Sequence, residues 1–260
     1  LNALAARVAL FQNKMTDAAN YAEAVLANSS FSLASTAMDF SKNWVAGSSS
    51  PEIIFAYVNN SRASSPLNFT LYVNDTDGSW NYAPSDWCYN SLFADDNTLS
   101  RKGDVRLKAT FTSQDANRVI KYPNGTYQLA ETSDYTCTPV VISRISEMYL
   151  IKAEALGKTN GAAALVEYMK KRYTTAPSEA AIKALSDKEY QTLILDERRR
   201  EFYAEGMRWQ DIKRTNRLEL LETLDGRTYL MYYPIPQDEI DMAGTAAYPQ
   251  NPGYAGYTGN

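Results

Sequence analysis

The first 27 residues carry the apolar pattern of two short antiparallel helices, and this pattern constrains the fold more than any other feature. Leu4, Val8 and Phe11 recur at the spacing of one helix face, and Asn13 and Lys14 form the turn. The apolar residues of the second helix that face back are Ala18, Tyr21, Ala22 and Val25. A single helical hairpin cannot bury its own apolar face, so other helices of the chain must cover it.

A second helical hairpin is predicted further along the chain. Helical periodicity returns over residues 141–156, a turn follows at 157–160, and residues 162–173 form the returning helix. The first hairpin resembles one tetratricopeptide repeat, and the second is similar to it. Residues 187–214 are also strongly helical and heavily charged.

The stretch between the hairpins has a different character, because Ser, Asn, Asp, Gly and Pro are frequent and helical periodicity fades. Short strands are predicted at residues 53–58, 69–73 and 119–122. The tail, residues 229–260, contains Pro234, Pro236, Pro249 and Pro252, which predicts extended coil and turns.

The predicted fold class is mainly α: tetratricopeptide-like helical hairpins with a large loop-rich insertion that contains a few short strands. Residues 1–28 form a helical hairpin, residues 29–140 the insertion and proposed ligand-binding region, and residues 141–260 a helical region with the proline-rich tail. We expect all three parts to form one compact domain.

The composition excludes several classes of protein. The chain has no histidine, which removes Ser-His-Asp catalysis, Cys-His catalysis and the common histidine zinc sites. Cys88 and Cys137 lack metal-binding spacing, so they form either a disulfide or two buried thiols. A net charge of −4 gives no reason to expect a basic face for nucleic acid. We therefore expect no metal, no cofactor and no nucleic-acid partner.

Neither a membrane span nor a signal peptide is visible. No stretch approaches the ~20 consecutive apolar residues that a span requires, and residues 1–26 have the pattern of a folded helix. Because the sequence starts within this pattern, we expect an N-terminal part, with any export signal or lipid anchor, to precede Leu1.

Three segments carry a distinctive combination of motifs. They are RISEMYLIKAEA at residues 144–155, a run at 196–214 that contains DERRREF and EGMRWQDIKR, and YPIPQDEI at 233–240 followed by QNPGY at 250–254. In this order and spacing they resemble the C-terminal part of the SusD/RagB family.

The resemblance implies a function, partners and a location. SusD/RagB proteins are non-catalytic lipoproteins of the outer membrane at the cell surface, and they capture glycans such as starch for a SusC-like TonB-dependent transporter. We therefore expect oligosaccharide binding, no enzymatic activity, and a lipid anchor on an N-terminal part absent from this chain. Residues 51–55 and 104–106 also look like family landmarks, whereas Met207 stands where the family usually has histidine.

The charged helix has two interpretations. Glu197, Glu201 and Glu205 share one helix face, where arginines three or four residues away can pair with them. A catalytic role is one interpretation, and the favoured one is a structural clamp, because arginine forks hold carboxylates in fixed geometry. The predicted ion network is Arg144, Glu147, Glu154, Glu197, Arg198, Glu201, Glu205, Arg208 and Asp211.

An aromatic cluster in the insertion is the candidate ligand site. Sugars need aromatic faces for their apolar C–H patches and carboxylates or amides for their hydroxyls. The candidate ligand-binding residues are Tyr72, Asn74, Asp75, Asp77, Trp80, Tyr82, Trp87 and Tyr89. The structural alternative is that Trp80 and Trp87 only anchor the insertion on the helices.

Two other functions remain as alternatives. A helical-repeat scaffold that binds peptides or proteins, or a peptide-importing relative, would need no sugar site. A glycoside hydrolase would need two carboxylates in an aromatic cleft, for which Asp75, Asp77 and Asp86 are candidates.

Overall fold

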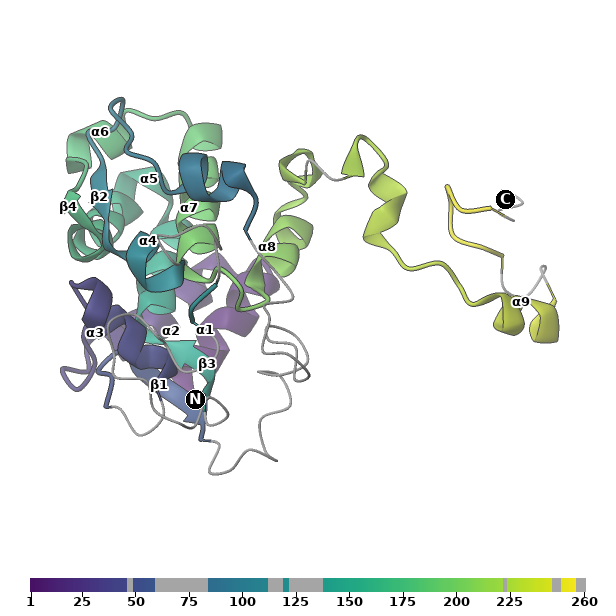
Figure 1. The fold of residues 1–260 in the computed structure, drawn as a ribbon, viewed down its shortest axis with the longest axis horizontal. Coiled ribbons are helices and arrows are strands. Elements are labelled where there is room, and N and C mark those ends of the chain that lie inside the picture. The colour runs from purple at the N-terminus through teal and green to yellow at the C-terminus, as the bar shows by residue number, and fades with distance from the viewer. Residues whose placement is uncertain are drawn as a thin grey trace. The chain divides into compact units, whose positions relative to one another are not determined.

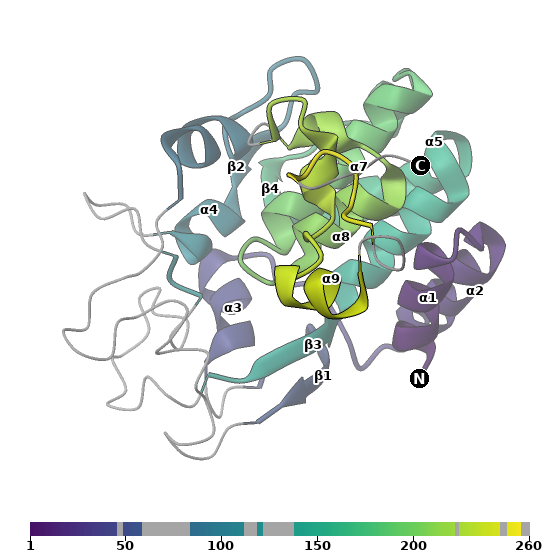
Figure 2. The same cartoon turned by 90° about the vertical axis from the view of Figure 1, so that its right-hand side faces the viewer.

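The computed structural model describes residues 1–45, 49–58, 84–111, 119–121, 138–221, 224–244 and 249–255. The chain forms two compact units, Leu1–Met207 and Arg208–Asn260. Figures 1 and 2 show the elements of both units from two directions.

The described residues form helices and four short strands. The helical elements are α1 (Asn2–Phe11), α2 (Met15–Leu26), α3 (Ala37–Ser41), η1 (Lys42–Trp44), η4 (Cys88–Leu92), α4 (Val105–Thr110), α5 (Ile145–Arg172), α6 (Glu179–Lys183), α7 (Asp187–Glu201), α8 (Met207–Thr215), η5 (Leu218–Leu220), η7 (Thr228–Met231) and α9 (Gln237–Ala243). The strands are β1 (Ile53–Tyr57), β2 (Lys102–Asp104), β3 (Val140–Arg144) and β4 (Tyr173–Thr175). The fold is mainly α with a few short strands, as predicted.

None of the helices in these described ranges has both the length and the apolar composition needed to cross a membrane.

Helices α1 and α2 form the predicted hairpin, with Asn13 in the left-handed conformation (φ 58°) at the turn. The two helices pack through small side chains, including Ala6, Ala18 and Ala22, which are fully buried. The face formed by Leu4, Val8 and Phe11, from which the hairpin was predicted, is instead the exposed one. Alanines let the helix backbones approach closely, so the core of the hairpin runs along them.

Helix α5 contains the second predicted hairpin. Gly157 breaks the helix with φ 65° and ψ 175°, and the two halves then pack closely. A Cβ at Gly161 would lie 2.2 Å from the carbonyl oxygen of Ala153, so only glycine fits this approach. Because the chain reverses after the break at Gly157, within the turn predicted at 157–160, both halves of α5 can contribute to one core.

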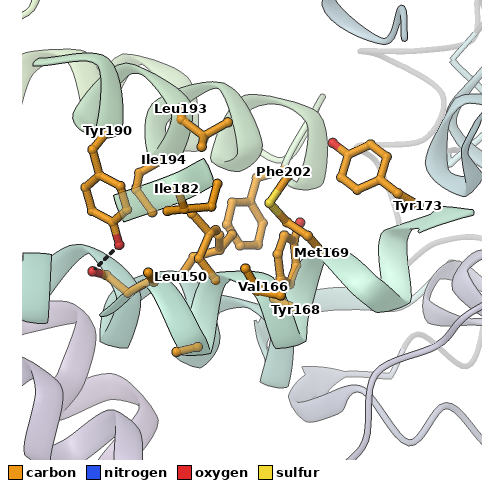
Figure 3. Packing of buried hydrophobic residues seen from close by; sticks show 14 residues of the cluster. Leu150, Val166, Tyr168, Met169, Tyr173, Ile182, Tyr190, Leu193, Ile194 and Phe202 are labelled. Carbon is orange, nitrogen blue, oxygen red and sulfur yellow. Dashed lines mark hydrogen bonds between the residues drawn. The ribbon is translucent and has the colours of Figure 1, made fainter. Parts of the chain in front are cut away.

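The main core lies between α5 and α7. Figure 3 shows its buried side chains, which include Leu150, Tyr168, Met169 and Ile194. The Tyr190 hydroxyl donates a hydrogen bond of 2.8 Å to a carbonyl of α5. Helix α7 begins with a capping box between Ser186 and Glu189, which satisfies backbone donors at its N-terminus.

The strands pair in two small antiparallel sheets, β1 with β3 and β2 with β4. The strand predicted at 53–58 is β1. The strand predicted at 69–73 lies outside the described residues. At 119–122 the described part, 119–121, forms one isolated bridge, between Val119 and Phe111, rather than a strand.

In the second unit, the C-terminal tail forms hydrogen bonds with the proline-rich segment that precedes α9. The side chain of Gln250 accepts a hydrogen bond from the backbone N–H of Ile235 (2.8 Å) and donates one to its carbonyl (3.0 Å). Asn251 donates from its side chain to the carbonyl of Tyr233 at 2.8 Å. The QNPGY segment therefore folds back on the proline-rich segment YPIP. The predicted boundaries at residues 28 and 140 stay predictions.

Candidate functional site

A buried charge cluster centred on Glu201, the last residue of α7, holds the first unit together. One carboxylate oxygen of Glu201 accepts from Arg144 (2.5 Å) and Arg172 (2.9 Å). The other accepts from Arg172 (2.9 Å), the hydroxyl of Tyr168 (2.8 Å) and Arg106 (3.3 Å). Glu201 and the three arginines are at most 1% exposed. The end of α7 is thereby fixed to β3, to α4 and to the C-terminal end of α5.

Glu197, one turn earlier on the same face of α7, extends this cluster. Its carboxylate accepts from Arg106 (2.9 Å), from Arg200 (2.9 Å) and from the hydroxyl of Tyr173 (2.5 Å). Arg106 is also paired with Asp104, which caps its own helix α4. The four-residue spacing of the two glutamates therefore places both carboxylates against the same guanidinium.

Glu52, directly before β1, joins the cluster from the other side. Its carboxylate accepts from Arg172 (2.7 Å), from Arg144 (3.2 Å) and from the backbone N–H of Ala34 (2.7 Å). Glu52 is fully buried. The cluster thus connects chain segments that are 120 residues apart.

The electrostatics keep the carboxylates of Glu201 and Glu197 ionised. Burial acts to raise the pKa of Glu201, but the charges of Arg172 and Arg144 outweigh it, so the pKa lies well below its ordinary value. The pKa of Glu197 is lowered against burial by Arg106 and Arg200. A general acid or base must exchange a proton with a bound substrate. Carboxylates that are fully buried and occupied by guanidiniums are unsuited to that role, so the geometry favours the structural clamp.

Lys121 extends the cluster beyond the end of α7. Its ammonium donates to the carbonyls of Glu201 and Tyr203 (3.0 Å each) and to the carboxylate of Glu205 (2.8 Å). Burial lowers the pKa of Lys121 to about 8, although Glu205 opposes the shift. Glu205 also accepts from Arg144 at 2.8 Å.

A second ion pair ties the first hairpin to α5. Arg7 on α1 forms a two-pronged pair with Glu147 (2.8 and 2.6 Å) and donates to the carbonyl of Ile142 (2.6 Å). Arg198 is fully buried, and its guanidinium lies 4.0 Å from Glu147. Glu154 is half-buried further along α5.

The remaining two residues of the predicted network, Arg208 and Asp211, belong to the second unit. Asp211 is buried and accepts from Arg214 at 2.9 Å, one turn along α8. Membership of Arg208 and Asp211 in the network around Glu201 stays a prediction.

Several members of the cluster were not predicted from the sequence: Glu52, Arg106, Lys121, Tyr168, Arg172 and Tyr173. Glu52 and Arg106 do fall in the segments 51–55 and 104–106 that look like family landmarks. Arg172 ends the buried face of α5, where a charge in an apolar pattern could have signalled a partner.

Most of the candidate ligand residues lie outside the described part of the chain. They are Tyr72, Asn74, Asp75, Asp77, Trp80 and Tyr82. Tyr89 lies within η4, but its side chain is outside the described set. Trp87 precedes η4 and is 41% exposed, with the Arg199 guanidinium 4.6 Å from its ring centre. The indole is therefore a surface group with a cation over its ring.

Cys88, the residue after Trp87, belongs to a buried apolar cluster. Cys88 is a free, buried thiol packed with Leu92, Phe93 and Phe111, while Cys137 lies outside the described residues. Burial raises the pKa of the Cys88 thiol. The packing leaves Trp87 at the surface and turns Cys88 inward.

Strand β1 presents two aromatic rings that the sequence analysis did not select. Phe55 is 49% exposed and Tyr57 is 60% exposed, and their ring centres are 5.2 Å apart in an edge-to-face arrangement. Alternate strand residues point to the same side, which explains their proximity. These rings directly precede the chain segment that carries most of the candidate ligand residues.

Comparison with known proteins establishes the class. The sequence model of the SusD family matches residues 93–228, and the chain belongs to this family. SusD-like protein P38 of Formosa agariphila is 30% identical over 142 residues, which are 50% of this chain and 27% of that relative. The resemblance inferred from the motifs is thereby confirmed.

Solved structures show the same fold. A SusD-like carbohydrate binding protein from Bacteroides vulgatus matches with a TM-score of 0.58 and 22% identity, covering 82% of this chain and 44% of that chain. Surface glycan-binding protein A from Bacteroides thetaiotaomicron, in complex with laminarihexaose, matches with a TM-score of 0.61 and 21% identity, covering 95% and 62%. The chain spans about a quarter to under two thirds of the length of these relatives.

Proposed function

We propose that this chain is part of an outer-membrane surface protein that captures oligosaccharides and delivers them to a SusC-like TonB-dependent transporter. Membership of the SusD family supports this function. The laminarihexaose complex of the similar surface glycan-binding protein A supports a glycan as ligand. The membrane attachment is proposed to be a lipid on an N-terminal part that precedes this chain.

The observation that carries the proposal is the set of exposed rings at both ends of the segment 59–83. In the sequence, Phe55 and Tyr57 precede this segment, and Trp87 follows it. An aromatic face stacks on the apolar face of a sugar ring, and the polar groups between the rings bind the hydroxyls. The sequence of this segment contains Asn74, Asp75 and Asp77, whose side chains carry polar groups of this kind.

The buried charge cluster gives this site a rigid base. Arg199, which covers Trp87, is on α7 next to Arg198 and Arg200, and Glu52 immediately precedes β1. Because Glu201 links Arg144 and Arg172 to α7, and both arginines bind Glu52, β1 and α7 are held in one arrangement. Rings fixed before binding lose little conformational entropy when a sugar stacks on them.

Calorimetry with a panel of purified oligosaccharides tests the proposal. We expect one or more of them to bind without release of new reducing ends. Trp87→Ala should weaken binding about tenfold, because a lost stacking contact is worth roughly 1–2 kcal/mol. Trp209→Ala is the matched control, since Trp209 is similarly exposed (38%) but lies on α8.

Three results would contradict the proposal. If wild type, Trp80→Ala and Trp87→Ala bind with equal affinity, the proposed aromatic site is wrong. Reducing-sugar release by the purified protein would replace capture with hydrolysis. Binding of peptides and of none of the sugars would favour the peptide-importing alternative.

A further inference from the structure

A second pocket with the composition of a sugar site lies within the second unit. It has a volume of about 370 Å³ and is lined by Lys213, Asn216, Leu218, Thr228, Tyr229, Met231, Tyr232 and Pro252. This volume falls at the lower end of the ~300–1,000 Å³ typical of small-molecule sites. A pocket of this size suits a single sugar unit better than an extended chain.

Two tyrosines form the aromatic walls of this pocket. Tyr232 is 59% exposed, so its ring is available for stacking. Tyr229 is half-buried and is held by the tail: Tyr254 packs edge-to-face on it with ring centres 5.1 Å apart. The hydroxyl of Tyr254 donates to the carbonyl of Tyr232 at 2.6 Å. The QNPGY segment therefore holds the ring of Tyr229 and the backbone at Tyr232.

Glycine at position 253 is required for this arrangement. Gly253 has φ +89°, and a Cβ there would lie 2.3 Å from the Tyr229 ring. The tail backbone thus lies directly against the tyrosine, and the wall is set by packing as well as by hydrogen bonds.

The polar groups of the pocket favour an acidic ligand. Among the described lining residues, Lys213 is the only charged one, and Asn216 and Thr228 add an amide and a hydroxyl. The Lys213 ammonium lies 5.5 Å from the centre of the Tyr232 ring. A sugar ring stacked on Tyr232 would therefore have an acidic substituent within reach of Lys213, where attraction between opposite charges adds to stacking.

We propose that this pocket binds one pyranose unit that carries an anionic group, either a carboxylate or a sulfate ester. Tyr232 stacks on the ring, and Lys213 pairs with the anion. The inference rests on the proposed function, because the pocket is a second contact for the same class of ligand and selects acidic glycans.

Protein-observed ¹⁹F NMR of the full chain labelled with 3-fluorotyrosine tests the proposal. Tyr229→Phe, Tyr232→Phe and Tyr233→Phe assign three resonances, and Tyr233 serves as the control because it is 92% exposed and does not line the pocket. The probes are methyl glucuronide, glucose 6-sulfate and methyl glucoside. We expect the Tyr229 and Tyr232 resonances to shift with at least one acidic sugar, at about tenfold lower concentration than with the neutral sugar, while the Tyr233 resonance stays constant.

Lys213→Gln should remove the preference for the acidic sugar and keep the stacking response, since Lys213 is exposed and its loss leaves the fold intact. An equal response to all three sugars, or no response, overturns the proposal. A response to a peptide containing leucine and phenylalanine, but to none of the sugars, overturns it in favour of a protein partner.

The same titrations in a Trp80→Ala/Trp87→Ala variant separate the two proposals. Tyr232 should still respond there. If oligosaccharide affinity is insensitive to both tryptophans while Tyr232 responds, the proposed insertion site fails and the pocket stands. If the tryptophan variants lose affinity while Tyr232 is silent, the pocket fails and the proposed function stands.

Discussion

Replacing Glu201 by glutamine removes one charge from the buried cluster while keeping the shape of the side chain. Glu201 accepts hydrogen bonds from Arg144, Arg172, Arg106 and Tyr168. Removal of one partner from a buried ion pair costs about 3–5 kcal/mol, because the opposite charges stay buried without compensation.

For Glu201→Gln we expect a cost near the lower end of this range of about 3–5 kcal/mol, because its arginine partners keep other carboxylates. Arg172 keeps its pair with Glu52, and Arg144 keeps both Glu52 and Glu205. We therefore expect Glu201→Gln to lower the free energy of unfolding by about 3 kcal/mol. For a chain of this size that corresponds to a fall in melting temperature of roughly 6–12 °C.

Urea unfolding followed by circular dichroism measures the difference directly. Glu179→Gln is the matched control: Glu179 pairs with Lys183 on α6, but both side chains are nearly half exposed, so the loss should stay below about 0.5 kcal/mol. A loss below about 1 kcal/mol for Glu201→Gln would refute the reasoning, because the cluster would then contribute no more than a surface pair.

The pH dependence adds an independent check on the same variant. The pKa of Glu201 is depressed in the folded protein, so its stabilisation is fully present above the unfolded pKa of ~4.3. The difference between wild type and Glu201→Gln should therefore be constant from pH 7 down to about 5. It should shrink only at lower pH, as the pH falls toward the folded-state pKa.

Three further predictions concern other parts of the structure. Gly161→Ala should destabilise the first unit by about 1–3 kcal/mol in the same urea assay, because its Cβ would lie 2.2 Å from the Ala153 carbonyl. The control Ala163→Ser, on the exposed side of α5, should be near neutral. Gly253→Ala should displace Tyr229, seen as a shifted ¹⁹F resonance for that residue, and an unchanged spectrum would contradict the packing described. Arg199→Ala should uncover Trp87 and increase acrylamide quenching of tryptophan fluorescence, and the increase should vanish when Trp87→Phe is also present.

Sequence patterns predicted the helices well, because periodicity and glycine positions act locally. The hairpins predicted at 1–27 and 141–173 are both present, but residues 141–144 form β3 instead of helix, and α5 begins at Ile145. The core face of α1 was not predicted, since a hydrophobicity pattern ranks Leu4 and Val8 above alanine. Close approach of two helices favours the small residue, and that preference depends on the partner helix.

The charge cluster was predicted only in part: Arg144, Glu197, Glu201 and Glu205 were named from the sequence, and the other members were not. The four-residue spacing of Glu197 and Glu201 shows that they share a face. Their partners Arg106 and Arg172, and the opposing Glu52, come from distant segments, and a single sequence does not show which of its many charges meet. The ligand site was predicted from composition alone, and of the residues chosen, Trp87 is the one whose side chain the structure describes.

Several ion pairs of the first unit join residues that are far apart in the sequence, and this separation affects the order in which the unit folds. Arg7 and Glu147 are 140 residues apart, and Glu52 and Arg172 are 120 apart. A chain that emerges N-terminus first, at roughly 5–20 residues per second, exposes Glu52 for about ten seconds before Arg172 and Glu201 can reach it. During that interval Glu52 lacks its partner Arg172. We therefore expect the first unit to close late, and a product that terminates before α7 to present these segments to proteases instead of folding.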